Sequence, residues 1–317
     1  MSVVDLSHVT KRFGPNLAVD DLTFDLKKGE MFGLLGPNGA GKTTTIRMML
    51  DIFKPDSGQV SVFDGPMNEA KKNRIGYMPE ERGLYREMPL ERSLIYLGTL
   101  KGLSTQEVRA RAEGYLERFD LTQHRHKKIK ELSKGMQQKA QIIATILHRP
   151  ELLIIDEPFS GLDPVNTELV KEILRELNQD GVTVIMSTHQ MHQVEELCDR
   201  ILLVNQGRRV LYGNLAEVRR RFSGHEVLVQ TGEDRPEILA GVPGVVEILP
   251  HNGAIKLRLE EEVTPNQVLR ALLAAGVDLH YFEVATPSLS EIFIRVVRGG
   301  ELREDPVHEG DGAGGSR

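Results

Sequence analysis

The sequence lacks three features that would each assign it to a particular class of protein. It has one cysteine, Cys198, so no internal disulfide can form, and no group of Cys and His around it suggests a zinc site. No apolar run approaches the roughly 20 residues of a membrane span, and the first residues lack the basic segment and apolar stretch of a signal peptide. We therefore expect a reducing compartment, and any membrane role has to come through a partner.

The sequence also lacks an excess of positive charge. It has 46 Asp and Glu against 40 Lys and Arg, which gives a formal net charge of -6. Nucleic acid is therefore not expected as a partner. The 40% hydrophobic and 27% charged residues are ordinary for a globular protein, and 317 residues allow one large domain and a smaller one.

One glycine-rich segment matches the phosphate-binding pattern G-x-x-x-x-G-K-[ST]. Before it, residues 31–35 form the short apolar run of a strand buried on both faces, and residues 42–52 after it have a helical pattern. In such a unit, backbone N–H groups surround phosphates and the helix N-terminus adds its positive dipole end. The residues expected to bind ATP here are Gly36, Pro37, Asn38, Gly39, Ala40, Gly41, Lys42, Thr43 and Thr44.

A second apolar run, residues 152–155, follows Glu151 and ends in Asp156 and Glu157. Residues 182–187 form a third such run, so a parallel α/β core is predicted, with ligands beyond the carboxyl ends of its strands. ATP hydrolysis needs a bound Mg²⁺ and a positioned water, and a metal-binding Asp beside a water-activating Glu fits this chemistry. The alternative is an acidic pair that only caps a strand.

Three further segments resemble motifs of the ABC family of ATPases. Residues 132–138, Leu-Ser-Lys-Gly-Met-Gln-Gln, resemble its signature sequence Leu-Ser-Gly-Gly-Gln. Residues 160–163, Ser-Gly-Leu-Asp, are similar to its D-loop, and His189 is similar to its switch histidine. The resemblance covers roughly residues 2–220. The remainder resembles the C-terminal extension of bacterial ATPases from drug, sodium or antibiotic exporters.

The resemblance implies a composite site shared by two copies of the chain. In the family, the signature turn closes over the γ-phosphate bound by the opposite subunit, and this chain carries one phosphate loop and one signature. The residues implied to bind the partner's nucleotide or align the two sites are Ser133, Lys134, Gly135 and Asp163. Without the resemblance, Ser133 is a plain helix N-cap and Asp163 belongs to a simple turn.

The resemblance also assigns roles within one copy. Glu157 and His189 are the implied catalytic residues, and Phe13 matches the aromatic residue that stacks on adenine. Taken alone, His189 reads as a histidine satisfied at a strand end and Phe13 as a core phenylalanine. The implied Mg²⁺ ligands are Thr43, Asp156 and Glu80.

Two segments depart from the family pattern. Glu80 stands where the family has a glutamine near Mg²⁺ and water, which adds negative charge near the γ-phosphate. Leu84 and Tyr85 follow it, and the resemblance implies apolar contacts there with a membrane subunit, against the alternative of a solvated turn. In the signature, Lys134 and Met136 replace Gly and Gln.

The expected fold is an α/β P-loop ATPase cassette followed by a small α+β domain. Residues 3–6 and 22–26 alternate as strands of an antiparallel subdomain, and residues 105–148 read as a helical subdomain. Residues 227–297 suggest a ferredoxin-like order with helices near 236–240, 265–275 and 288–297, and a hairpin through Asn252 and Gly253. The predicted boundaries are 1–222 for the cassette, 223–298 for the second domain and 299–317 for a disordered tail.

The expected function is that of the ATP-hydrolysing subunit of an ABC transporter. It is expected to form a homodimer and to lie on the cytoplasmic face of the membrane through a permease subunit, and the resemblance to exporter ATPases favours export. The alternative is a soluble ABC ATPase that remodels a ribosomal, DNA or regulatory complex. Such proteins often carry two cassettes or long coiled coils, whereas this chain has one cassette and no sustained heptads.

Overall fold

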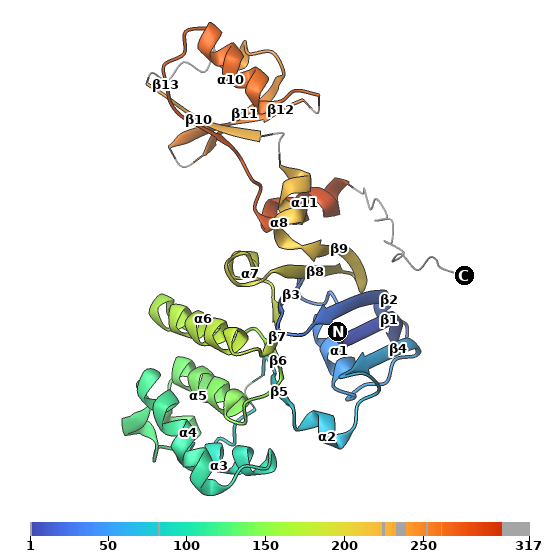
Figure 1. Ribbon diagram of the computed structural model, residues 1–317, viewed down its shortest axis with the longest axis vertical. Coiled ribbons are helices and arrows are strands. Elements are labelled where there is room, and N and C mark those ends of the chain that lie inside the picture. The colour runs from blue at the N-terminus through green and yellow to red at the C-terminus, as the bar shows by residue number, and fades with distance from the viewer. Residues whose placement is uncertain are drawn as a thin grey trace, which may run out of the picture.

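The computed structural model describes residues 2–81, 83–223, 226–232, 239–251, 253–260 and 262–299 (Figure 1). Its centre is a six-stranded sheet with strand order β5-β6-β7-β3-β8-β9. The first five strands in this order run parallel, and β9 pairs antiparallel with β8. The strands are β3 (Met31–Leu35), β5 (Ile75–Met78), β6 (Leu152–Asp156), β7 (Thr183–Thr188), β8 (Arg200–Asn205) and β9 (Arg208–Asn214).

The three central strands β3, β6 and β7 are buried at every residue, which confirms the prediction from their apolar runs. Their alternate side chains face two different cores. Met31 and Leu35 of β3 pack with the helices on one face, whereas Phe32 and Leu34 pack with a second sheet on the other. Figure 1 shows α5 (Lys134–Ile146) and α6 (Pro164–Gln179) on the first of these faces.

The second sheet is antiparallel, with order β2-β1-β4, as the alternating segments predict. Its strands are β1 (Ser2–Phe13), β2 (Asn16–Lys27) and β4 (Ser57–Val62). Helix α1 (Lys42–Met49) shares its apolar cluster and ends three residues earlier than the expected 42–52, because Asp51 takes a left-handed backbone with φ of 61°. The short helix α2 (Glu69–Lys72) lies between β4 and β5.

The predicted helical subdomain is present but begins earlier than residue 105. It starts with α3 (Leu90–Leu100), continues through α4 (Thr105–Arg118) and two 3-10 turns, η1 (Thr122–His124) and η2 (Ile129–Glu131), and ends with α5. Helix α6 joins β6 to β7, and α7 (Met191–Leu197) joins β7 to β8.

The C-terminal domain contains a four-stranded antiparallel sheet of order β11-β12-β10-β13, which is the predicted ferredoxin-like order. Its elements are β10 (Glu226–Thr231), β11 (Val245–His251), β12 (Ala254–Leu259), α10 (Pro265–Ala274) and β13 (Leu279–Val284). The expected hairpin joins β11 to β12, although Asn252 lies outside the described residues. So do most of the helix expected at 236–240 and residues 300–317 of the expected tail. The domain boundaries stay a prediction.

The last helix packs its apolar side chains against the cassette, and among the described residues none from this helix belongs to the apolar cluster of that sheet. Figure 1 shows α11 (Leu289–Gly299) beside α8 (Leu215–Phe222), between the cassette and the C-terminal sheet. Leu289 and Ile292 are buried in the apolar cluster of the cassette, together with Val194 and Val218. The chain therefore leaves the cassette after α8 and returns to it with α11.

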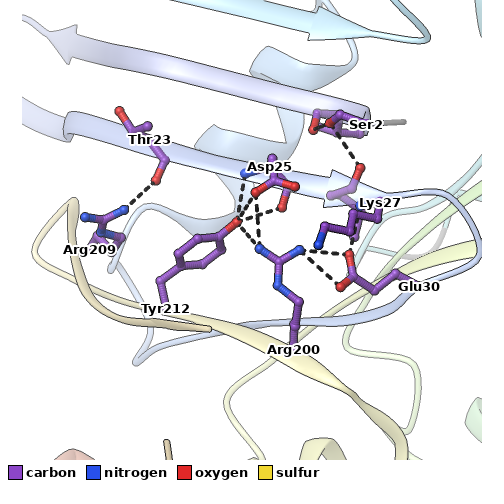
Figure 2. Close-up of polar contacts among 10 residues, drawn as sticks. Ser2, Thr23, Asp25, Lys27, Glu30, Arg200, Arg209 and Tyr212 are labelled. Carbon is purple, nitrogen blue, oxygen red and sulfur yellow. Dashed lines mark hydrogen bonds and ion pairs between the residues drawn. The ribbon is translucent and has the colours of Figure 1, made fainter. Parts of the chain in front are cut away.

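A polar cluster connects the antiparallel sheet to the edge of the central sheet (Figure 2). Arg200 of β8 donates from Nη1 to both carboxylate oxygens of Glu30 at 3.1 Å and from Nη2 to Asp25 at 3.2 Å. The Tyr212 hydroxyl of β9 donates to the same Asp25 carboxylate at 2.6 Å. Because β1 and β2 reach the candidate site described next, this cluster helps to set their position.

Within the described segments, no helix is both long and apolar enough to cross a membrane.

Candidate functional site

The phosphate-loop segment joins β3 to α1 at the carboxyl end of the central sheet. Gly36 and Gly41 have φ of 150° and 105°, in the region that favours glycine. Space requires glycine as well, because a Cβ at Gly36 would lie 2.2 Å from the Val204 carbonyl oxygen and one at Gly41 2.4 Å from that of Ala18. Each position is therefore restricted to glycine by both conformation and packing.

Lys42 is buried at the start of α1. Its Nζ donates to the carbonyl oxygens of Gly36 at 2.7 Å and Pro37 at 3.1 Å. Burial lowers the pKa of Lys42, while the charges of three carboxylates act to raise it. These carboxylates are Glu157, Asp156 and Glu80.

Asp156 and Glu157, at the end of β6, are only 2% and 6% exposed. The Thr43 hydroxyl donates to Asp156 Oδ2 at 3.1 Å and so connects α1 to this strand. Burial raises the pKa of the Asp156 carboxyl, and hydrogen bonding, including that from Thr43, partly opposes the rise. The acidic pair is thus part of a buried site and does not only cap a strand.

Glu157 is held by donors from the end of the neighbouring strand β7. Its Oε2 accepts from the Thr188 hydroxyl at 3.0 Å, and its Oε1 accepts from the His189 backbone N–H at 2.9 Å. His189 Nδ1 lies 2.7 Å from the same Oε1. Glu157 also has a left-handed backbone with φ of 52°, a strained conformation that is typical of functional sites.

A cavity of about 530 Å³ brings most of these residues together. Phe13 lies at its wall with 42% of its surface exposed, so it is not a core phenylalanine, and its ring forms a T-shaped pair with that of Phe53 at 5.2 Å between centroids. The cavity is lined by Phe13, Asn16, Leu17, Ala18, Asn38, Gly39, Ala40, Gly41, Lys42, Thr43, Thr44, Glu80, Asp156, Glu157 and Gln206.

Four of these lining residues were not predicted from the sequence: Asn16, Leu17, Ala18 and Gln206. Gln206 belongs to the turn between β8 and β9, where the Gly207 N–H donates to the Ala40 carbonyl at 2.9 Å. A turn at Gln206 and Gly207 is readable from the sequence, but nothing in that pattern indicates that it lies against the phosphate loop.

The residues of the signature-like and D-loop-like segments lie elsewhere. Ser133 caps α5 by accepting from the Met136 N–H at 3.2 Å, and Asp163 caps α6 by accepting from the Asn166 N–H at 2.9 Å. The two segments adjoin, since a Cβ at Gly135 would lie 3.2 Å from the Gly161 carbonyl oxygen. Among the described residues, the cavity wall does not include Ser133, Lys134, Gly135, Asp163 or His189.

The residues on both sides of Glu80 are held by α5, because the Gln141 side chain donates to the Pro79 and Glu81 carbonyls at 2.9 and 3.3 Å. Leu84 is buried in the cassette core, so the expectation that it contacts a membrane subunit is wrong. Tyr85 remains 51% exposed.

Comparisons with known proteins agree with this architecture. The sequence model described as "ABC transporter" matches residues 19–160, and that of the DrrA1-3-like ATP-binding protein C-terminal domain matches residues 213–297. The chain is 43% identical over 295 residues to the uncharacterised ABC transporter ATP-binding protein YhaQ of Bacillus subtilis strain 168, covering 93% of this chain and 98% of that protein. It is 33% identical to the Nod factor export ATP-binding protein I of Rhizobium sp. strain N33, over 92% and 96% of the two chains.

The fold also matches solved structures. The dimeric structure of MJ0796, a bacterial ABC transporter cassette, superposes with a TM-score of 0.62 at 25% identity. The match covers 67% of this chain and 98% of that cassette.

Proposed function

The chain belongs to the ABC transporter ATP-binding proteins, and on that premise we propose that it hydrolyses MgATP between two copies of itself and thereby drives export by a permease. As an ATPase of this family it works with a membrane permease and dimerises. The observation that carries the proposal is the cavity in which the phosphate loop faces Asp156 and Glu157.

The nucleotide would lie along the cavity from Phe13 to the acidic pair. The exposed face of Phe13 stacks on the adenine, and the backbone N–H groups of residues 38–44 hold the phosphates. Lys42 turns from the Gly36 and Pro37 carbonyls, its present acceptors, to the β- and γ-phosphate oxygens. The charge on these oxygens is a stronger acceptor than a carbonyl.

The residues at the phosphate end of the cavity suit Mg²⁺. Thr43, Asp156 and Glu80 all supply oxygen ligands, the kind that Mg²⁺ prefers, and few protein ligands are needed when phosphate supplies others. The Thr43 hydroxyl already lies 3.1 Å from Asp156 Oδ2, and Glu80 lines the same cavity. When bound, Mg²⁺ neutralises charge on the phosphate oxygens.

Glu157 is the proposed general base. Its carboxylate is buried at the cavity wall and is held by Thr188 and His189, so it stays oriented while it accepts a proton from the attacking water. His189 keeps Glu157 and the γ-phosphate in register. The imidazole has 52% side-chain exposure, and in this proposal its exposed part faces the nucleotide.

A second copy of the chain would complete the site. Ser133 and Lys134 are exposed at the start of α5, away from the cavity of their own copy, and Asp163 is exposed at the start of α6. Facing the partner's nucleotide, the first turn of α5 offers free N–H groups and the charge of Lys134 to the γ-phosphate. Asp163 and the adjoining Gly161 segment align the two copies.

The names of the relatives support export. One relative is named for Nod factor export, and the match to the DrrA1-3-like C-terminal domain extends the likeness beyond the cassette. We place the chain on the inner face of the cell membrane, held there by its permease. Extraction in detergent followed by pulldown is expected to recover an integral membrane protein. Recovery with ribosomes and no membrane protein would overturn this part of the proposal in favour of a remodelling ATPase.

The hydrolytic site is tested by Glu157→Gln. We expect steady-state ATPase activity to fall by about 100-fold or more, because a general base is lost, while ATP binding is retained. The variant should accumulate as an ATP-bound dimer in size-exclusion chromatography. Glu151→Gln, directly before the start of the same strand, is the control and should keep its activity. Normal turnover of Glu157→Gln would remove Glu157 as the base.

A further inference from the structure

Helix α11 is joined to α7 by a hydrogen bond between distant parts of the chain. The backbone N–H of Leu289, the first residue of α11, donates to Glu195 Oε1 of α7 at 2.6 Å. Beneath this contact, Leu289 and Ile292 are 2% and 1% exposed and pack in one cluster with Val194 and Leu197 of α7. The two helices therefore share both a polar contact and an apolar interface.

The surroundings of Glu195 favour this contact. Its side chain is 18% exposed, and its carboxylate lies at the N-terminus of α11, where the helix dipole favours negative charge. Arg219 of α8 lies 4.0 Å from Glu195 and donates to the Pro287 carbonyl at 3.3 Å, just before α11 begins. Glu195 thus satisfies an amide that a helix N-terminus otherwise leaves without an intrahelical partner.

The N-terminal end of α7 lies next to the candidate catalytic residues. It begins at Met191, two residues after His189, whose N–H and ring lie 2.9 and 2.7 Å from Glu157 Oε1. Glu196, which follows Glu195 in α7, forms an ion pair with Lys171 of α6. A displacement of α7 therefore changes the position of His189 relative to Glu157.

The first turn of α11 is tied in turn to the C-terminal sheet. Lys256 of β12 is 7% exposed and donates to Glu291 Oε1 at 2.6 Å, and its ammonium lies 3.1 Å from Glu226. The other oxygen of Glu291 accepts from the N–H and hydroxyl of Ser288 at 2.9 and 3.0 Å. A continuous set of contacts thus runs from the C-terminal sheet through α11 and α7 to His189.

We propose that Glu195 is a positioning residue for ATP hydrolysis. By holding the Leu289 amide, it fixes α7, and with it His189, to α11 and the C-terminal domain. Movement of that domain then changes the position of His189 relative to Glu157. In this way the C-terminal domain can regulate the rate of ATP hydrolysis. This inference rests on the proposed roles of His189 and Glu157.

The test compares Glu195→Ala with Glu195→Gln in the full chain, and Glu172→Ala on the exposed side of α6 is the control. In Glu195→Ala we expect faster amide hydrogen exchange across residues 187–192. Its kcat should fall roughly 3- to 10-fold, the size of coupling through a packed network, with the KM for ATP unchanged. Glu195→Gln keeps an acceptor oxygen, so it and the control should behave like the parent chain.

Unchanged exchange in a folded Glu195→Ala variant would overturn the inference. Should that variant fail to fold, Lys256→Met breaks the link at the C-terminal sheet and leaves Glu195 in place. Lys256→Met is expected to raise amide hydrogen exchange across residues 288–292 and to lower kcat, as Glu195→Ala does. An unchanged kcat would also count against the inference.

The double variant His189→Ala/Glu195→Ala separates this inference from the proposed function. Because Glu195 acts through His189, its removal should add little to the loss caused by His189→Ala. A full additional loss would overturn the role of Glu195 and leave that of His189 intact. Normal turnover in His189→Ala alone would instead overturn the proposed role of His189.

Discussion

The three carboxylates around Lys42 differ in burial, and this difference sets what each can do. Asp156 and Glu157 are almost fully buried and hydrogen-bonded, whereas Glu80 is exposed on the cavity wall. A carboxylate that is buried and held by hydrogen bonds is suited to keeping a metal ion or a water molecule in a fixed position. An exposed one can add charge to a bound cation while remaining hydrated.

We therefore expect Glu80→Gln to act on Mg²⁺ more than on ATP. The amide keeps an oxygen ligand but loses the charge, so the Mg²⁺ concentration for half-maximal ATPase activity should rise about 3- to 10-fold. A Mg²⁺ titration at saturating ATP measures this. Glu81→Gln, the exposed neighbour, serves as control, and identical titrations for the two variants would show that the Glu80 carboxylate has no special role.

At Phe13 the π-face and not the residue identity should matter. Phe13→Tyr keeps the ring and is expected to leave the KM for ATP within a factor of two. Phe13→Ala removes it and should weaken ATP binding by about 1–3 kcal/mol, the typical contribution of base stacking on an aromatic ring. Fluorescent-nucleotide titration measures both, and equal affinity of the two variants would contradict adenine stacking.

At the scale of elements, the cluster in Figure 2 holds β2 against β8 and β9. Burial raises the pKa of Tyr212 to about 12, and its hydrogen bond to Asp25 adds to the rise. Burial acts to raise the pKa of Asp25 as well, but hydrogen bonds from Tyr212 and Arg200 outweigh it and the net shift is downward. The neutral hydroxyl and the carboxylate therefore stabilise each other.

This cluster predicts a loss of stability in alkali. Because the folded pKa of Tyr212 lies above the unfolded value of about 10, its contribution is fully present below pH 10 and is lost as pH rises towards 12. Between pH 9 and 11.5, the melting temperature of the parent chain should fall more than that of Tyr212→Phe. Parallel curves for the two proteins would show that the Tyr212 proton does not contribute.

The sequence predicted elements well where one local pattern decides them. The strand at residues 31–35 was placed correctly, because a short apolar run followed by glycines has few other readings. The helix after the phosphate loop is shorter than the sequence predicts, because the left-handed turn at Asp51 has no strong local sequence signal. Leu84 was misread because its sequence neighbourhood is polar, whereas the folded chain buries it in the apolar cluster shared by the helical subdomain and the central sheet.

At the scale of the whole molecule, sequence patterns predicted the two folds but not how α11 connects them. The amphipathic pattern of residues 288–297 shows that one face is buried, but it does not show against which partner. The partner is the cassette core, through Leu289 and Ile292. The lining residue Gln206 was missed for a similar reason, because its turn reaches the phosphate loop through the pairing of β8 with the distant strand β3. Leu17 lies in the hairpin of β1 and β2, whose position against the phosphate loop has no local sequence signal.

This connection predicts that removing α11 and removing the C-terminal sheet have different effects on the cassette. A chain ending at residue 285 loses Leu289 and Ile292 from the core, and burial of two such side chains is worth about 3–6 kcal/mol. Replacing residues 224–286 by a short flexible linker keeps α11. Arg219 of α8 contacts Pro287, so the two ends to be joined lie close together.

We expect the chain ending at residue 285 to unfold at a markedly lower urea concentration than the parent. The linker variant should stay within about 1 kcal/mol of a control that ends at Gly299, because its cassette core is intact. The linker variant retains Glu195 with its amide partner but loses Lys256, so its basal ATPase activity should fall no further than in Lys256→Met, and any regulation that requires the C-terminal sheet should be lost. Equal stability of the truncated and linker variants would mean that α11 does not contribute to the cassette core, and the route from the C-terminal domain to His189 would lose its physical basis.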